Sequence, residues 1–383
     1  MSSAIKNNIA LVLSGGGARA AYQVGVLMAI KDILPPQSSP FSIISGTSAG
    51  AINAVSLASN SHDFQAGVDE LHHLWEHLTI DHVFRTGWKD LVGGVYRFGR
   101  SFFHEGVDYH RPLSLLDNSP LNAFLKSNIN FSDIQRNIDR GILTAVSVAA
   151  LGYASGNSIN FFQGNEKIEE WVRCRRIGRP TIIGMEHLLA SSAIPWIFPT
   201  VRIGQEYFGD GAMRQLAPIS PALHLGADRI FIIGVSGNRQ AQVKKQPLRS
   251  RHPPSMAQMA GHLLNSAFVD SLEADIEHLN RVNKLITLAS DEHRQALELR
   301  PVRSLVISPS KAIDKIAGRH VRYLPKSVRF FMRSSGATAR RGGSVLSSYL
   351  LFVKSFTDEL IELGYQDAMW EKEAIKQFFL DEE

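Results

Sequence analysis

Residues 42–53 read "SIISGTSAGAIN" and place Ser48 at the junction of an apolar run and a run of small residues. The apolar residues 41–45 predict a short buried strand, and residues 49–59 have the composition of a helix. A serine in a turn between a strand and a helix accounts for this pattern structurally. The pattern is equally typical of a serine nucleophile held on a sharp turn.

The residues two before and two after this serine are Gly46 and Gly50, which gives the spacing G-x-S-x-G. A nucleophile on a strained strand-to-helix turn needs glycine at both positions, because a side chain there would collide with neighbouring backbone. The five-residue pattern alone is common. Its position between a predicted strand and a predicted helix makes Ser48 a candidate nucleophile.

The same order of elements occurs once more upstream. Residues 8–14, "NIALVLS", predict a buried strand, three glycines follow, and residues 18–34 predict a helix that ends before Pro35. Two strand–turn–helix units in the first sixty residues predict a parallel sheet with flanking helices. Further strands are expected within residues 141–164 and 229–235, and a hairpin over residues 200–211.

The composition changes after residue 235. A linker rich in Pro, Arg and Gln leads to predicted helices over residues 256–290 and 348–370. We therefore expect an α/β unit over residues 8–235 and a mainly helical C-terminal region over residues 236–383, whose role the sequence leaves open.

The overall composition fits a globular protein, with 44% hydrophobic and 20% charged residues among 383. The single cysteine, Cys174, cannot form an intramolecular disulfide and suits a reducing compartment. No apolar stretch approaches the roughly 18 residues of a membrane span. The apolar run after Lys6 is too short for a signal peptide and ends at Gly15. A cytoplasmic protein, at most peripherally attached to a membrane, is expected.

The net charge of +5 is concentrated in two segments. Residues 239–251 and 319–341 carry five and seven basic residues, respectively, and no acidic residue. A solvated face explains both segments, and an anionic membrane surface is the alternative. No nucleic-acid partner is expected. In the second segment, five basic residues recur at spacings of three or four and would share one helix face, although Pro325 interrupts the helix: Arg319, Arg322, Lys326, Arg329 and Arg333.

The glycines Gly15, Gly16 and Gly17 open the first predicted helix and fit a dinucleotide-binding pattern together with Ala20. The acidic residue expected about twenty positions later is missing, because residues 37–40 read "QSSP". Free backbone N–H groups at a helix N-terminus can hold an oxyanion as well as a phosphate.

Asp210 lies between two glycines in "FGDGAM". Asp-Gly is a common hairpin turn, but the residues that follow contain two prolines and lead into a predicted helix. A carboxylate held between glycines can approach another backbone closely and accept the proton of a serine.

The motifs "GGGAR", "GTSAG" and "DGA" in this order, with "ASSAIP" at residues 190–195, resemble the patatin-like phospholipase family over about residues 8–235. The resemblance implies a three-layer α/β fold and a lipid acyl hydrolase that cleaves carboxylic esters of phospholipids. It implies Ser48 as nucleophile and Asp210 as base, without histidine. It also implies an oxyanion loop of the three glycines supported by Arg19, with no metal or cofactor.

Two other interpretations stay open. An α/β-hydrolase triad would order serine, aspartate and histidine along the chain, with His224, His252 or His262 as the histidine. A non-catalytic nucleotide- or lipid-binding module would use the glycine loop but leave the other motifs unexplained. The substrate's head group and the oligomeric state are not predicted.

Overall fold

The computed structural model describes residues 8–36, 38–101, 112–236, 255–290, 292–293, 300–334 and 344–380. The strands are β1 (Ile9–Leu13), β2 (Ile43–Thr47), β3 (Ala145–Gly152), β4 (Ser158–Gly164), β5 (Trp171–Arg173), β6 (Arg176–Pro180), β7 (Val201–Ile203), β8 (Glu206–Asp210), β9 (Arg229–Ile233) and β10 (Arg303–Ile307). The helices up to β9 are α1 (Ala21–Ile33), α2 (Ala49–Ser59), α3 (Phe64–His77), α4 (Ile80–Val83), α5 (Trp88–Ser101), α6 (Ser119–Asn128), α7 (Ser132–Asp139), α8 (Met185–Ser191) and α9 (Ser220–His224). The later helices are α10 (Met256–Asn265), α11 (Ser271–Leu288), α13 (Ile313–His320), α14 (Lys326–Ser334), α15 (Ser344–Leu350), α16 (Lys354–Trp370) and α17 (Lys372–Leu380).

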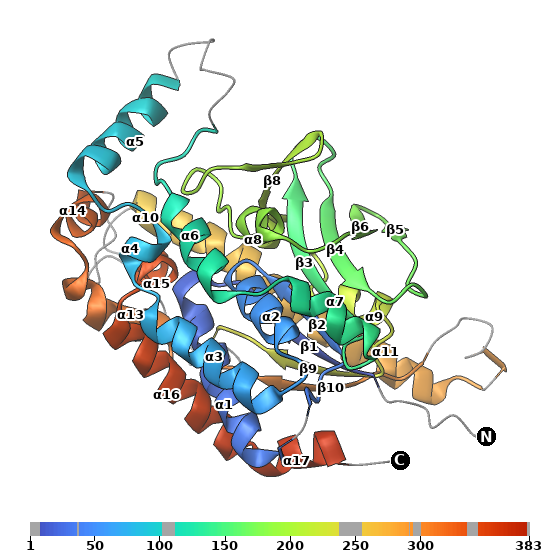
Figure 1. Cartoon of the computed structure of the whole chain (residues 1–383). Coiled ribbons are helices and arrows are strands. Elements are labelled where there is room, and N and C mark those ends of the chain that lie inside the picture. The colour runs from blue at the N-terminus through green and yellow to red at the C-terminus, as the bar shows by residue number, and fades with distance from the viewer. Residues whose placement is uncertain are drawn as a thin grey trace.

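These strands form one mostly parallel sheet in the order β10-β9-β1-β2-β3-β4-β6-β5, with β8 paired to both β3 and β7. Strands β10, β9, β1, β2 and β3 run parallel, whereas β4 and β8 run antiparallel to β3. The carboxyl ends of β1 and β2 therefore lie at the same edge of the sheet (Figure 1). Binding sites of parallel sheets form at this edge.

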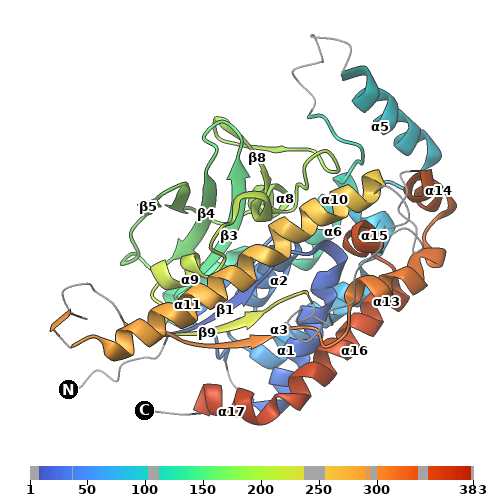
Figure 2. The same cartoon turned by 180° about the vertical axis from the view of Figure 1, so that it is seen from behind.

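Helices cover both faces of the sheet, so the side chains of its central strands are buried on both sides. In β1, Leu11 packs into the core on the side of α1, α2, α3 and α16, and Val12 packs into the core on the side of α9 and α11. Phe231 and Ile232 of β9 divide in the same way. Figures 1 and 2 show these helices on the two sides of the sheet. The predicted α/β fold with a mostly parallel sheet and flanking helices is confirmed.

The mainly helical C-terminal region is also confirmed, and it shares the core of the preceding residues. Strand β10 extends the sheet beside β9. Helix α16 lies along α1, where the Tyr22 hydroxyl donates to Asp367 Oδ2 at 3.0 Å. The Arg229 side chain donates to the Phe378 carbonyl in α17 at 2.9 Å. The division at residue 235 stays a prediction, and apolar packing continues across it.

One predicted helix is wrong in extent. Residues 348–370 were expected as a single helix, but α15 ends at Leu350 and α16 begins at Lys354. The break falls where four consecutive side chains, from Tyr349 to Phe352, are all buried. The core around these side chains, and not the composition of the segment, sets the path of the chain here.

Of the two basic segments, only the second contains residues that the structure describes. Residues 239–251 lie outside the described residues. Pro325 separates α13 from α14, as the sequence suggests, so the basic stripe does not form one helix face. Arg319 lies on α13 and pairs with Glu359, whereas Lys326, Arg329 and Arg333 lie on α14. Among the described helices, none combines the length and the apolar character needed to cross a bilayer.

Candidate active site

Ser48 follows β2 directly and precedes the first residue of α2. Its backbone angles, φ 54° and ψ −129°, lie in a region that residues other than glycine rarely adopt. Such strain persists only where the surrounding structure holds it, and it is concentrated at functional sites. The Ser48 N–H donates to the Ser191 hydroxyl of α8 at 2.8 Å, which is one of the contacts that hold the turn.

The two flanking glycines are required by close backbone contacts. A Cβ on Gly50 would lie 2.5 Å from the carbonyl oxygens of Leu13 and Ser14, at the end of β1. A Cβ on Gly46 would lie 2.4 Å from the carbonyl oxygen of Gly50. The first turn of α2 therefore packs against the end of β1, which brings Ser48 beside the loop that follows that strand.

The Asp210 side chain contacts Ser48 directly. The Ser48 hydroxyl donates to Asp210 Oδ2 at 2.7 Å, and the Ala212 N–H donates to Asp210 Oδ1 at 2.9 Å. Strand β8 carries Asp210 to this place, because it pairs with β3 with Ala150 opposite Asp210. The Asp210 N–H also donates to the Ala193 carbonyl at 2.9 Å. Both carboxylate oxygens are thus oriented by hydrogen bonds.

Burial controls the protonation of this carboxyl group. Asp210 is completely buried, and desolvation raises its pKa from 3.8 to about 7, although the hydrogen bonds from Ser48 and Ala212 favour the charged form. A group whose pKa lies near neutrality can accept and return a proton at similar cost. The pair has the geometry and the proton affinity for nucleophilic catalysis.

The glycine loop between β1 and α1 lies against the serine. A Cβ on Gly15 would lie 3.1 Å from the Ser48 Cβ atom. Gly17 has φ +55°, and a Cβ there would lie 2.2 Å from the Tyr349 carbonyl oxygen. Within the described ranges, the N–H groups of Gly15 and Gly16 have no hydrogen-bond acceptor. Free N–H groups beside a serine are suited to hold a developing oxyanion.

Arg19 does not contact Ser48 but ties the loop to the C-terminal region. Its Nε donates to Ser348 Oγ at 2.7 Å, and one terminal nitrogen donates to Asn265 Oδ1 at 3.4 Å. Its guanidinium lies 4.1 Å from the centre of the Tyr349 ring. Arg19 is buried, and no carboxylate of the described chain lies within salt-bridge distance of it. Arg19 therefore places a buried positive charge next to the glycine loop.

Several contacts around the site were missed by reasoning from the sequence. Ser191 belongs to the "ASSAIP" stretch, which carried the family resemblance without a role for this hydroxyl. Gln215 accepts a hydrogen bond from the Thr47 hydroxyl at 2.5 Å and so joins the end of β2 to the segment after Asp210. Tyr349 and Asn265 come from the region without motifs, where no local signal distinguishes them from other helix residues.

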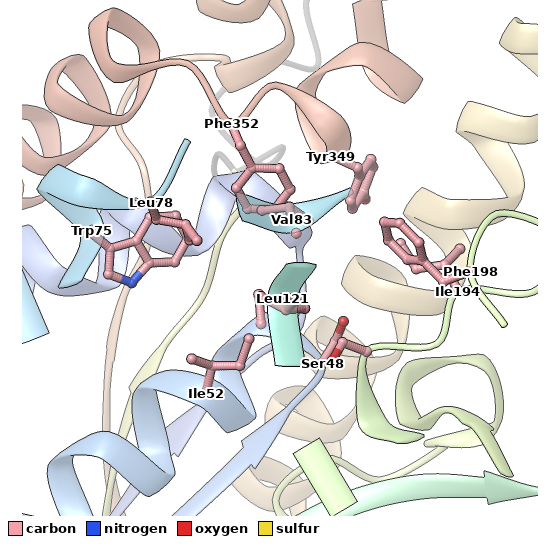
Figure 3. Close-up of a pocket in the computed structure, with 13 residues that line it drawn as sticks. Ser48, Ile52, Trp75, Leu78, Val83, Leu121, Ile194, Phe198, Tyr349 and Phe352 are labelled. Carbon is pink, nitrogen blue, oxygen red and sulfur yellow. The ribbon is translucent and has the colours of Figure 1, made fainter. Parts of the chain in front are cut away.

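Ser48 opens into an apolar pocket that several separate segments line (Figure 3). Trp75 and Val83 come from α3 and α4, Leu78 follows the end of α3, and Phe352 comes from the turn after α15. The complete lining consists of Gly17, Ser48, Ala49, Ile52, Trp75, Leu78, Val83, Leu121, Ser192, Ile194, Phe198, Tyr349 and Phe352. Such a lining suits a hydrocarbon chain and contains no charged group to bind a polar ligand.

The histidines proposed for a triad lie elsewhere. The His224 ring stacks on Trp171 at 4.9 Å on the sheet face covered by α9 and α11, away from the pocket. His262 is exposed on α10, and His252 lies outside the described residues. In the part of the chain that the structure describes, no histidine forms a hydrogen bond with Ser48 or Asp210.

The model of the family described as patatin-like phospholipase matches residues 11–223, a range that includes Ser48 and Asp210. The solved structure of VipD from Legionella pneumophila is 13% identical and aligns over 93% of this chain and 67% of that chain, with a TM-score of 0.34. None of the curated proteins matches the chain.

Proposed function

The chain belongs to the patatin-like phospholipase family, and on that basis we propose that it is a lipid acyl hydrolase with Ser48 as nucleophile and Asp210 as general base. The observation that carries this proposal is the 2.7 Å hydrogen bond from the Ser48 hydroxyl to Asp210, at the wall of an apolar pocket. A serine whose proton already points at a buried carboxylate is prepared for attack on an ester.

In the first half of the reaction, Ser48 Oγ bonds to the carbonyl carbon of the ester while its proton passes to Asp210 Oδ2. The carbonyl oxygen becomes an oxyanion in the tetrahedral intermediate. When the intermediate collapses, the bond to the leaving alcohol breaks and the alcohol takes the proton from Asp210. The acyl group stays bound to Ser48 as an ester.

The second half restores the enzyme. Water adds to the acyl carbon and gives its proton to Asp210, which forms a second tetrahedral intermediate. The bond to Ser48 Oγ then breaks, the serine recovers the proton, and a carboxylic acid leaves. The same carboxylate serves as base and acid in both halves, so a pKa near 7 suits it.

The glycine loop stabilises the oxyanion in both intermediates. The N–H groups of Gly15 and Gly16 supply hydrogen bonds where negative charge develops. The buried charge of Arg19 adds a favourable potential through the same loop without touching the substrate. The apolar pocket holds the acyl chain, which supports esters of apolar acyl groups as the substrate class.

A fluorophosphonate probe tests the nucleophile, because it forms a stable bond only with an activated serine. We expect one adduct, located on Ser48 by mass spectrometry, in wild type and in the Ser192→Ala variant, which removes another hydroxyl of the pocket. Ser48→Ala should lose the adduct and on the order of 10⁶-fold in turnover of p-nitrophenyl butyrate. An adduct on another serine, or activity retained by folded Ser48→Ala protein, would refute the assignment.

A further inference from the structure

Helix α5 exposes an apolar stripe to solvent. Trp88, Val92 and Tyr96 are 52%, 61% and 66% exposed, and they are spaced four residues apart. Val95, 46% exposed, lies on the same side of the helix. An amphipathic helix on a protein surface normally turns its apolar side toward the core. In α5 apolar side chains also face outward, which indicates that another surface covers them.

The side of α5 next to the stripe is packed, so the orientation of this stripe is set by the fold. Leu91 is buried, and a Cβ on Gly94 would lie 2.1 Å from the Leu115 carbonyl oxygen. At the start of the helix, the Ser327 hydroxyl of α14 donates to the Thr86 carbonyl at 2.6 Å. Figures 1 and 2 show α5 at the outer edge of the molecule, next to α14. Rotation of α5 to bury the stripe would break these contacts.

Helix α14 extends the apolar stripe. The Phe330 ring is 61% exposed and lies 5.5 Å from the Trp88 ring, measured between centroids. Val328 and Met332 on the same helix are buried and hold it against the core. Phe330 is therefore directed outward by the packing of its own helix.

Basic side chains border this stripe. On α5, a helical turn of about 100° per residue places Lys89 and Arg100 beside Tyr96 along one edge of the stripe, and Asp90 on the far side from it. On α14, the segment 326–334 carries no acidic residue. We name this the α5–α14 surface and define it by these residues: Trp88, Lys89, Val92, Val95, Tyr96, Arg100, Lys326, Phe330 and Arg333, all exposed.

The α5–α14 surface is connected to the wall of the acyl pocket. The Leu115 backbone, on which Gly94 packs, donates its N–H to the Trp196 carbonyl at 2.8 Å. The residues on either side of that position, Ile194 and Phe198, line the pocket. Trp196 itself is 63% exposed and adds an aromatic ring near this end of the pocket. A binding partner in contact with the α5–α14 surface would therefore lie next to the pocket that contains Ser48.

We propose that the α5–α14 surface docks the protein on an anionic phospholipid bilayer, with the rings of Trp88, Tyr96 and Phe330 at the boundary between head groups and acyl chains. An exposed aromatic stripe beside cations is the pattern of helices that lie in the plane of a membrane surface. The cations match the negative charge of the head groups. This inference rests on the proposed function for its purpose, which is the delivery of acyl chains to Ser48, but docking itself requires no catalysis.

The test is sedimentation of the full chain with vesicles of phosphatidylcholine, with and without phosphatidylserine. Ser48→Ala serves as the background, so that lipid is not consumed. We expect binding only to vesicles that contain phosphatidylserine, and weaker binding at high salt. The double variant Lys89→Gln and Arg100→Gln should weaken that binding roughly 30-fold at low salt. Trp88→Ala with Tyr96→Ala should weaken it at least about tenfold.

The matched control uses α11, which exposes Leu285 and Leu288 beside Lys284 at the opposite end of the molecule (Figures 1 and 2). Lys284→Gln with Leu285→Ala and Leu288→Ala should bind vesicles as the background protein does. With Ser48 restored, every variant should hydrolyse dissolved p-nitrophenyl butyrate at the wild-type rate, which shows that the fold is intact.

Equal vesicle binding by the α5 variants and the control would overturn the proposal, as would absence of binding by the background protein. A dimer by light scattering that the α5 variants convert to a monomer would overturn it in favour of contact between two copies of the chain. If docking behaves as expected but wild type hydrolyses no ester, the proposed function fails and the docking surface stands.

Discussion

At the scale of single residues, the site depends on a carboxyl group that the fold has removed from water. Asp210 is buried completely; its side chain accepts hydrogen bonds from the Ser48 hydroxyl and the Ala212 N–H, and its backbone N–H donates to the Ala193 carbonyl. Burial raises the pKa of Asp210 to about 7, which is unfavourable for folding but suitable for a base that acts near neutral pH.

The pH dependence of activity follows from this pKa. Asp210 accepts a proton only when it is ionised, so kcat/KM for p-nitrophenyl butyrate should rise with pH and level off above about 7. Below that value the rate should fall about tenfold per pH unit. A pH–rate profile on protein shown by circular dichroism to stay folded makes the measurement. An inflection near pH 4 would mean that the base is an ordinary exposed carboxylate.

Asp210→Asn should reduce turnover on the order of 10⁴-fold, because the amide cannot accept the serine proton. The same change should raise the stability at pH 8. A carboxyl group with a raised pKa in the folded state favours folding below its unfolded pKa of about 3.8, and this contribution is lost as pH rises through about 7. We expect a gain of roughly 1–3 kcal/mol in the free energy of unfolding at pH 8, and none at pH 4.

Urea unfolding at the two pH values measures this difference. His262→Ala, which changes an exposed residue of α10, provides the control and should leave both activity and stability unchanged. A loss of activity in His262→Ala or His224→Ala comparable to that of Asp210→Asn would instead support a triad with histidine.

At the scale of elements, the glycine loop is supported by two helices that come much later in the chain. Helix α15 places Tyr349 over the Arg19 guanidinium, and α10 places Asn265 where it accepts hydrogen bonds from both of them. The Tyr349 hydroxyl donates to Asn265 Oδ1 at 2.9 Å. These contacts indicate that the C-terminal region helps to hold the loop in place.

Arg19→Lys tests whether geometry or charge matters at this position. Lysine keeps the positive charge but cannot reproduce the planar fork that reaches Ser348 and Asn265 together. We expect kcat to fall roughly 10- to 100-fold, while KM changes little, since the loop acts mainly on the transition state.

Tyr349→Phe is the matched control, because it removes only the hydroxyl and keeps the ring over Arg19 and in the pocket. Its effect on kcat should be smaller than that of Arg19→Lys. Steady-state kinetics and thermal unfolding of both variants separate a displaced loop from a loss of stability. An unchanged kcat in folded Arg19→Lys protein would show that the loop keeps its geometry without these contacts.

At the scale of the whole molecule, the sheet and its core include residues from both ends of the chain. Phe378 of α17 packs against Phe231 of β9 at 5.7 Å between ring centroids, and its carbonyl accepts the hydrogen bond from Arg229. Phe41 packs against Phe379 at 5.5 Å, also between centroids. The residues before and after position 235 thus stabilise each other.

Phe378→Ala should lower the free energy of unfolding by about 3–5 kcal/mol, because it leaves a cavity in this shared core. Trp370→Ala, at an 82% exposed position on α16, should change it by less than about 0.5 kcal/mol. Urea unfolding measures both. If residues 8–235 formed an independent unit, Phe378→Ala would leave their unfolding transition unchanged and produce a second, earlier one.

The sequence by itself determined the local units of this protein. Its short apolar runs followed by glycine and small residues predict the first two strand–turn–helix units, and both are present. Ser48 and Asp210 could be singled out because the turns that carry them need particular residues at fixed spacings. The family resemblance was readable for the same reason, and the match to residues 11–223 confirms it.

Only the tertiary structure decided which distant segments complete the site. Arg19 and Ser348 are separated by 329 positions, and no periodicity or motif relates them. The break between α15 and α16 likewise depends on what surrounds Tyr349 and Phe352, not on their own helix propensity. A hydrophobic pattern in the sequence predicts that a residue is buried. The hydrophobic effect has no direction, however, so the packing of the whole chain selects the residues that contact it.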